Sequence, residues 1–178
     1  MVTLLDAPAR RQEPMSEILE RQRASFTADG PPGLALRRNR IDRLVALVLD
    51  NSDDFVDAMA ADFGTRPREG SLFTEIMGMI SVIEHTRSRV RQWMRSTKLM
   101  RGARPVGLRA EVEPSPLGVV GIIGPWNFPL NLVVLPASAA FAAGNRGMSK
   151  MSEVTPRTAT LMAALAPAYF DTTELHVV

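Results

Sequence analysis

The sequence predicts an α/β protein in which an N-terminal helical segment is followed by a truncated doubly wound parallel sheet. Two observations carry this prediction. In the first half of the 178-residue chain, apolar residues recur at the three-and-four spacing of amphipathic helices. Beyond Pro116 the pattern becomes strand, helix, strand, helix, strand, which is the order that builds a parallel sheet with crossover helices.

Three helices are expected in the first part of the N-terminal segment, residues 1–104. The first covers about 16–29 and stops at Gly30-Pro31-Pro32, and the second ends near Asn51. Ser52 is in position to cap the third helix, and Gly64 is expected to close it.

A longer helix is predicted from about Ser71 to Met94. One stripe of residues along it steps by three or four positions, as the buried face of an amphipathic helix does. We expect this stripe to be core and not a ligand surface: Phe73, Ile76, Ile80, Ile83, Arg87, Val90 and Met94.

The sequence pattern changes at about Leu99 to Pro105, where Gly102, Pro105 and the nearby Gly107 predict a linker. The first alternating segment, Leu108 to Val112, follows it. Residues 105–115 therefore separate the helical segment from the sheet-forming residues 116–178.

The sheet region contains three predicted strands and two predicted helices. Pro129 and Pro156 suit first helical turns, Thr155 suits an N-cap, and Gly144 suits the position after a helix end. The strands are expected at Val119 to Ile123, about Arg146 to Ser149 and Leu175 to Val178, and the helices at Pro129 to Ala143 and Pro156 to Ala168.

The amino-acid composition limits the kinds of metal site and catalytic nucleophile that the chain can contain. The chain has no cysteine and two histidines, His85 and His176, so we expect no thiolate or multi-histidine metal site and no thiol nucleophile. The N-terminus does not read as a secretory signal, and the longest apolar stretch, Leu132 to Gly144, is shorter than the roughly 20 residues of a membrane span. We expect a cytoplasmic protein with no membrane partner.

A run of basic residues allows two interpretations. It contains no acid and could be a nucleic-acid footprint, but apart from Trp93 it lacks interleaved aromatic residues. We favour a solvated helix face with its following loop, and no nucleic-acid partner. The run comprises Arg87, Arg89, Arg91, Arg95, Lys98, Arg101 and Arg104.

Ligands of doubly wound sheets bind at the carboxyl ends of the strands, which here are the turns after Ile123 and near Lys150. The glycines of the first turn do not have the G-x-G-x-x-G spacing, and close packing alone would explain them. Pro125 and Pro129 stiffen the run between them. Its Asn127 could donate to a developing oxyanion or simply cap the next helix, and Trp126 could simply be core.

Several motifs together resemble the N-terminal part of the aldehyde dehydrogenase superfamily. The resemblance covers nearly the whole chain, and the motif after Lys150 is similar to the coniferyl aldehyde dehydrogenase branch. It rests on Ala61-Asp62-Phe63-Gly64, the stretch from Pro116 through Gly124-Pro125-Trp126-Asn127-Phe128-Pro129, Ala143-Gly144-Asn145, Lys150-Met151-Ser152-Glu153 and Thr155-Pro156-Arg157-Thr158.

The resemblance implies a Rossmann-like fold, roles for particular residues, and homo-oligomers in the full-length family. Asn127 would help to hold the oxygen of the thiohemiacetal. Lys150 and Glu153 would hold the adenosine ribose, unless they are only a solvated pair. A carboxylate at Glu153 would repel a 2′-phosphate, which favours NAD over NADP. The cofactor's path would be lined by Ile123, Gly124, Pro125 and Trp126.

The sequence also departs from the family pattern. Gly147 and Ser149 stand where the family has apolar strand residues, which predicts a weakened strand. The sequence stops at Val178, before the family's pyrophosphate-binding turn, general-base glutamate and nucleophilic cysteine. The strand that would pair with 108–112 in the oligomerisation arm, which begins in 105–115, is also missing, so exposed edges are expected.

Three functional hypotheses follow. The parent protein would oxidise an aldehyde, coniferyl or another aromatic one, to a carboxylic acid with NAD, while the isolated chain would be inactive. Alternatively, the chain is a non-catalytic nucleotide-binding or subunit-interaction module. In the third hypothesis it is a fragment without a function of its own.

Overall fold

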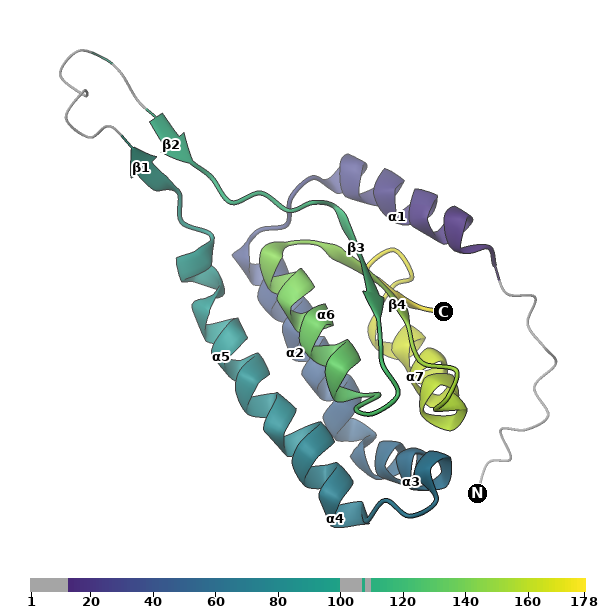
Figure 1. Cartoon of the computed structure of the whole chain (residues 1–178). Helices are drawn as coiled ribbons and strands as arrows, with labels where there is room; N and C mark the ends of the chain where they lie inside the picture. Colours follow the sequence, from purple (N-terminus) through teal and green to yellow (C-terminus); the bar gives the residue numbers. More distant parts are fainter. Residues whose placement is uncertain (1–12, 100–106, 108–109) are drawn as a thin grey trace.

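A computed structural model describes residues 13–99, 107 and 110–178 (Figure 1). As expected from the sequence, a helical segment comes first and is followed by alternating strands and helices. The helices are α1 (Met15–Asp29), α2 (Leu34–Asp50), α3 (Ser52–Phe63), α4 (Arg68–Ser71), the π-helical segment η2 (Leu72–Met77), α5 (Gly78–Trp93), α6 (Asn131–Ala143) and α7 (Pro156–Tyr169); the strands are β1 (Thr97–Leu99), β2 (Ala110–Val112), β3 (Val119–Ile123), β4 (Arg146–Lys150) and β5 (Leu175–Val177).

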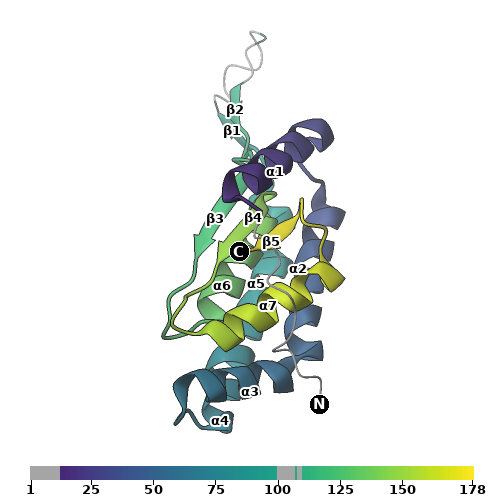
Figure 2. The same ribbon diagram turned by 90° about the vertical axis from the view of Figure 1, so that its right-hand side faces the viewer.

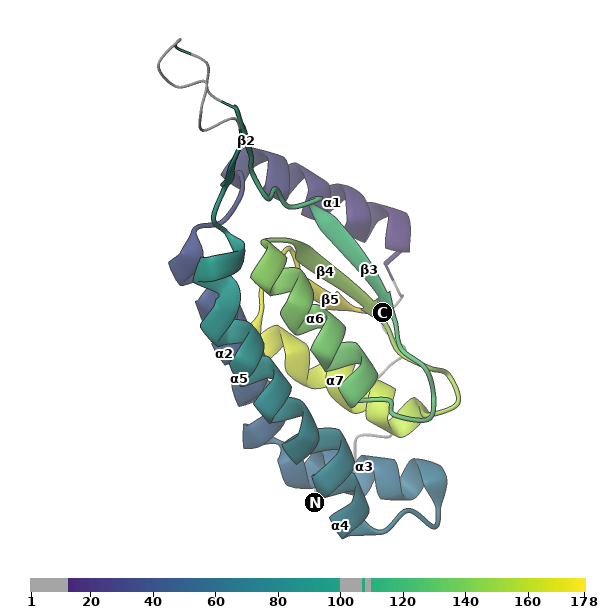
Figure 3. The ribbon, with the colours of Figure 1, turned by 60° about the vertical axis from the view of Figure 1, so that its left-hand side comes forward.

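The central sheet is parallel and has the order β3-β4-β5, which confirms the predicted α/β class with parallel strands. Ile123 at the end of β3 pairs with Lys150 at the end of β4, and Gly147 pairs with Leu175 of β5. Helix α6 connects β3 to β4, and α7 connects β4 to β5. Strands β3 and β4 lie between α6 and α1 (Figure 3).

Groups outside the strand contact the polar start of β4. The Arg146 side chain is 3% exposed, lies 2.5 Å from the carboxylate of Asp29, and donates to the carbonyl of Thr173 at 2.8 Å. From α1, the Gln22 amide donates to the carbonyl of Gly147 at 2.8 Å. These partners explain how β4 forms although its sequence departs from an apolar strand pattern.

The core lies between the sheet and a second helical layer. Helices α2 and α5 pack on α6, and α3 packs on α7, so the first half of the chain covers the helices of the second half (Figure 2). The largest fully buried apolar side chains of this core come from both halves: Ile41, Leu44, Leu47, Phe55, Met59, Met79, Ile83, Leu130, Phe141 and Met162.

The long helix predicted from Ser71 to Met94 is interrupted by its π-helical start. Because a π-turn takes up an extra residue, the inward face shifts relative to a regular stripe. The expected core positions are confirmed at Ile76, Ile83 and Val90 but wrong at Phe73, which is 69% exposed. Arg87 is exposed as well and pairs with Asp42.

Helix boundaries were predicted better than helix caps. Gly64 and Gly144 follow α3 and α6 with φ of 73° and 91°, as expected of helix ends. Ser52 is the first residue of α3 and does not cap it, and the Thr155 side chain does not cap α7. Helix α6 starts after Pro129, at Asn131.

A short antiparallel hairpin of β1 and β2 projects from the body (Figures 1 and 2). Thr97 pairs with Val112, and Leu99 pairs with Ala110. No sequence pattern had marked β1 as the partner of β2. Most of the predicted linker and residues 108–109 of the alternating segment lie outside the described residues, as do Arg101 and Arg104 of the basic run.

No helix in the described part of the chain combines the length and the apolar character that crossing a membrane requires.

Candidate functional site

The carboxyl ends of β3 and β4 lie side by side, and the two turns singled out from the sequence follow them (Figures 1 and 3). The amide of Gly124 donates to the carbonyl of Lys150 at 2.8 Å and fastens one turn to the other. Ile123 is 83% exposed at this end of the sheet. The fold thus brings together the segments 123–127 and 150–153.

Gly124 permits a close approach of helix to strand. A Cβ atom added there would lie 2.3 Å from Cγ2 of Val133 in α6 and 3.7 Å from the carbonyl oxygen of Lys150. Real Cβ atoms essentially never approach another atom to 2.3 Å. The absence of a side chain at Gly124 therefore allows α6 to pack this closely under the turn.

The turn from Pro125 to Pro129 presents its central side chains to solvent. Trp126 is 57% exposed, which excludes the alternative in which it is only a core residue. Asn127 is exposed and does not cap α6, because the first amide of that helix, from Asn131, donates to Glu75 instead. The side-chain amide of Asn127 makes no hydrogen bond to the described residues, which leaves its NH2 group available to a ligand.

Two residues beneath this turn were not anticipated from the sequence. Glu75 is fully buried, accepts the Asn131 amide at 2.9 Å, and has its other oxygen 2.9 Å from the Arg66 guanidinium. Burial raises the pKa of the Glu75 carboxyl, against the lowering effect of the Asn131 amide and of Arg66. The only sequence signal for Glu75 is that an acid stands next to Ile76 of the apolar stripe. No sequence signal distinguishes Arg66 from other arginines.

Lys150 and Glu153 form an ion pair at the end of β4. The Lys150 ammonium donates to Glu153 at 2.9 Å and to the carbonyl of Met151 at 3.3 Å. The two side chains are 48% and 81% exposed. The hydrogen bond from Lys150 lowers the pKa of the Glu153 carboxyl, which is therefore an anion at neutral pH. This geometry suits both a ribose-binding pair and a solvated pair.

Hydrogen-bonding and charged side chains lie at this end of the sheet. Asn127 offers an amide donor, Lys150 an ammonium donor, and Glu153 a carboxylate acceptor. The exposed apolar side chains of Ile123 and Trp126 come shortly before Asn127 in the sequence. Within the described ranges, no group of three or more histidine, aspartate and glutamate side chains is arranged to hold a metal.

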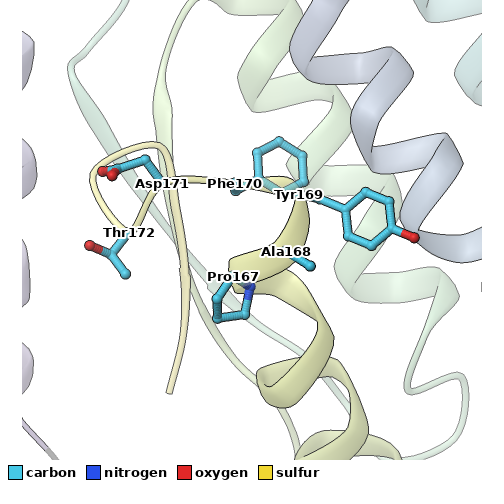
Figure 4. Close-up of a pocket in the computed structure, with 6 residues that line it drawn as sticks. All are labelled: Pro167, Ala168, Tyr169, Phe170, Asp171 and Thr172. Carbon is cyan, nitrogen blue, oxygen red and sulfur yellow. The ribbon is translucent and has the colours of Figure 1, made fainter.

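A surface hollow elsewhere offers less chemistry. It lies at the carboxyl end of α7 and the first residues of the connection to β5, and it is open to solvent (Figure 4). Its one acid, Asp171, accepts hydrogen bonds from Thr173, which lower its pKa. Because one continuous stretch of chain lines the whole hollow, we interpret it as the surface of a local turn and not as a binding site. Its lining is Pro167, Ala168, Tyr169, Phe170, Asp171 and Thr172.

Known proteins resemble this chain in sequence and in fold. Coniferyl aldehyde dehydrogenase of Pseudomonas sp. is 44% identical over 166 residues, which are 93% of this chain and 34% of that protein. Among solved structures, Staphylococcus aureus AldH in a substrate-bound state matches with a TM-score of 0.85 and 23% identity, over 94% of this chain and 36% of that one. Streptococcus pyogenes succinic semialdehyde dehydrogenase, in complex with NADP+, matches with a TM-score of 0.71 and 20% identity, over 91% and 35%.

These matches confirm the resemblance seen in the motifs. The structural likeness confirms the fold: this chain has the architecture of a segment of larger aldehyde dehydrogenases. The chain spans about a third of the length of the relatives it matches. The sequence model described as the aldehyde dehydrogenase family matches residues 3–178, and the chain therefore belongs to the aldehyde dehydrogenase family.

Proposed function

We propose that this chain supplies the cofactor-binding N-terminal part of an NAD(P)-dependent aldehyde dehydrogenase, which oxidises an aldehyde to a carboxylic acid. The observation that carries the proposal is the arrangement at the carboxyl ends of β3 and β4, where Asn127, Lys150 and Glu153 are exposed at one end of a parallel sheet. Parallel α/β sheets bind their ligands at this end.

The donor set fits the ribose of a dinucleotide. The Glu153 carboxylate can accept hydrogen bonds from ribose hydroxyls, and the Lys150 ammonium can donate to them. Both side chains are exposed and already lie together, so binding would order few additional groups. Ile123, Gly124, Pro125 and Trp126 would line the path of the bound nucleotide. When bound, the nicotinamide accepts the hydride of the aldehyde.

The proposed role of Asn127 is to donate its amide to the oxygen that becomes negative during attack on the aldehyde. Two prolines restrict the turn, and no described residue takes up the amide. A preorganised donor of this kind is worth about 3 kcal/mol in comparable acyl-transfer reactions. The 178 residues contain no cysteine to act as the family's nucleophile, so we expect no turnover from them alone.

An aromatic aldehyde of the coniferyl type is the substrate class we propose for the whole protein. Its support is the 44% identity to the Pseudomonas sp. enzyme of that name. In this proposal the polar groups of this segment would contact the cofactor and the reacting oxygen, and they carry no preference among aldehydes.

NAD is the preferred cofactor in this proposal, because the Glu153 carboxylate would repel the 2′-phosphate of NADP. Replacing Glu153 by Gln removes that charge, and we expect the ratio of NAD+ to NADP+ affinity to fall by about two- to fivefold. Calorimetric or NMR titration of this chain with each nucleotide measures the ratio. Glu84→Gln is the matched control, since it removes an equal charge from the exposed side of α5.

If the ratio of NAD+ to NADP+ affinity is the same in Glu153→Gln as in the unmodified chain, the Glu153 carboxylate does not select NAD over NADP. A ratio that changes equally in Glu84→Gln would show only the effect of net charge. Binding of neither nucleotide by the unmodified chain would count against the cofactor-binding role as a whole.

A second candidate function is subunit interaction through the hairpin, whose strand β2 lies in residues 105–115, where an oligomerisation arm would start. It is favoured by the exposure of every residue of β1 and β2, including Leu99 at 47% and Val112 at 56%. Exposed apolar side chains on a projecting two-stranded edge are suited to pairing with another chain. A dimer in sedimentation experiments, together with no nucleotide binding, would favour this function over the first.

A further inference from the structure

The Arg66 side chain lies directly beneath the turn that carries Asn127. Its guanidinium lies over the rings of Phe63 and Phe128, with its central carbon 4.8 Å and 5.6 Å from their centroids. One guanidinium nitrogen donates to the backbone carbonyl of Asn127 at 3.4 Å, and the other donates to the Thr74 hydroxyl at 3.3 Å. The planar group therefore contacts both the backbone of Asn127 and the ring that follows it.

Glu75 holds the other end of the same turn. One oxygen accepts the backbone amide of Asn131, where α6 begins, and the other lies 2.9 Å from the Arg66 guanidinium. The Asn131 side chain returns a hydrogen bond to the carbonyl of Thr74 at 3.0 Å. Arg66 and Glu75 thus link the two ends of the segment 127–131 through one ion pair.

The backbone around Glu75 is adapted to this contact. Glu75 lies within the π-helical segment Leu72–Met77, which turns it fully inward while Phe73 stays exposed. Single π-turns within helices are rare and are frequently found at functional sites. A buried ion pair is weak support for stability, because apolar residues of similar volume often stabilise as well. We therefore interpret the Arg66–Glu75 ion pair as a contact that positions the turn.

We propose that Arg66 and Glu75 are positioning residues that fix the location of Asn127 at the end of β3. The inference rests on the proposed function, in which the amide of Asn127 contacts the reacting oxygen. Neither Arg66 nor Glu75 touches that oxygen. They act through the carbonyl of Asn127, the ring of Phe128 and the first amide of α6.

The test is the order of the turn, measured by amide ¹⁵N relaxation in the full 178-residue chain without any ligand. In the unmodified chain the amides of Trp126, Asn127 and Phe128 should have order parameters of about 0.85, as rigid backbone does. In Arg66→Gln these order parameters should fall below about 0.6, the range of flexible segments. Arg68→Gln is the matched control: it removes a neighbouring arginine that pairs with Asp53 and Asp57.

Glu75→Gln provides the second variant, because glutamine keeps an acceptor for Asn131 but loses the charge opposite Arg66. We expect it to loosen the turn as well, and Arg66→Gln alone decides the matter if this variant fails to fold. A lower melting temperature in Arg66→Gln, with the Asn127 order parameter unchanged, would overturn the proposal, because a purely stabilising arginine gives that result. Equal loosening in Arg68→Gln would overturn it too.

This measurement is independent of nucleotide binding. A chain that binds no NAD+ but loses the order of its turn in Arg66→Gln would refute the proposed function and support the positioning of Asn127. A chain that binds NAD+ and keeps an ordered turn in Arg66→Gln would support the proposed function and refute the positioning of Asn127.

Discussion

At the scale of single residues, Gly124 shows how local packing determines the geometry of the candidate site. It connects β3 to the Pro-Trp-Asn-Phe-Pro turn, and its amide is bonded to the carbonyl of Lys150. There is no room for a side chain, because Val133 of α6 occupies the space a Cβ atom would take. Valine is stiff about its first side-chain torsion and cannot move aside cheaply.

Gly124→Ala should therefore destabilise the fold by about 1–3 kcal/mol, the usual cost of forcing extra volume into a packed site. Urea unfolding followed by circular dichroism measures the difference. Gly121→Ala in the preceding strand, β3, is the control, since no atom lies within 4 Å of its added Cβ. Equal costs for both alanines would show that the close approach to Val133 is not what requires glycine at this position.

The sequence was informative about candidate site residues that belong to a contiguous motif. Asn127, Lys150 and Glu153 were identified from their motifs, and the structure places them at one end of the sheet. Arg66 and Glu75 could not be predicted in the same way. Their partners Asn127 and Asn131 are 61 and 56 positions distant, and only the packing of the π-helical segment against α6 brings them together.

At the scale of elements, helix starts are stabilised by acids from other elements. The first amides of α7, from Arg157 and Thr158, donate to Asp62 of α3 at 3.0 Å and 2.9 Å, and the Thr158 hydroxyl donates to it at 2.7 Å. An acid at a helix N-terminus also interacts favourably with the helix dipole. The sequence pattern favoured Thr155 for this capping role, because capping signals in a sequence come only from neighbouring positions.

Asp62→Ala should lower the free energy of unfolding by about 1 kcal/mol, as the loss of an N-cap does. Asp57→Ala is the control in the same helix. Its exposed carboxylate pairs only with Arg68 in the described structure, so a change within about 0.5 kcal/mol is expected. Chemical denaturation of both variants gives the comparison, and an equal effect of the two would argue against capping by Asp62.

At the scale of the whole molecule, the helical half and the sheet half are joined by polar contacts as well as by the core. Arg40 and Arg43 of α2 contact the carboxylate of Glu174, which precedes β5, at 2.9 Å and 2.7 Å. The arrangement of strands and crossover helices was predictable from the sequence, because hydrophobic period and turn residues are local signals. This joining of α2 to β5 was not, since charged residues on a helix are ordinarily solvated.

Stability should fall in acid because of this contact. Burial acts to raise the pKa of the Glu174 carboxyl, but the hydrogen bonds from Arg43 and Arg40 outweigh it and leave the pKa lowered. A carboxyl with a lowered pKa stabilises the fold fully above its ordinary pKa, and this contribution is lost as pH falls through the lowered value. The difference in unfolding free energy between the unmodified chain and Glu174→Gln should therefore be large at about pH 7 and shrink toward about pH 3.

Urea unfolding of both proteins across this pH range measures the effect, and a difference that stays constant with pH would show that ionisation of Glu174 does not contribute.

The proposal that the carboxyl ends of β3 and β4 form part of a dinucleotide site is tested most directly by titrating the ¹⁵N-labelled chain with NAD+ at millimolar concentration. We expect chemical shift changes at the amides of Ile123, Gly124 and residues 150–153, where exposed polar groups meet at the end of the sheet. Changes confined to the hollow at 167–172, or no changes at all, would contradict it.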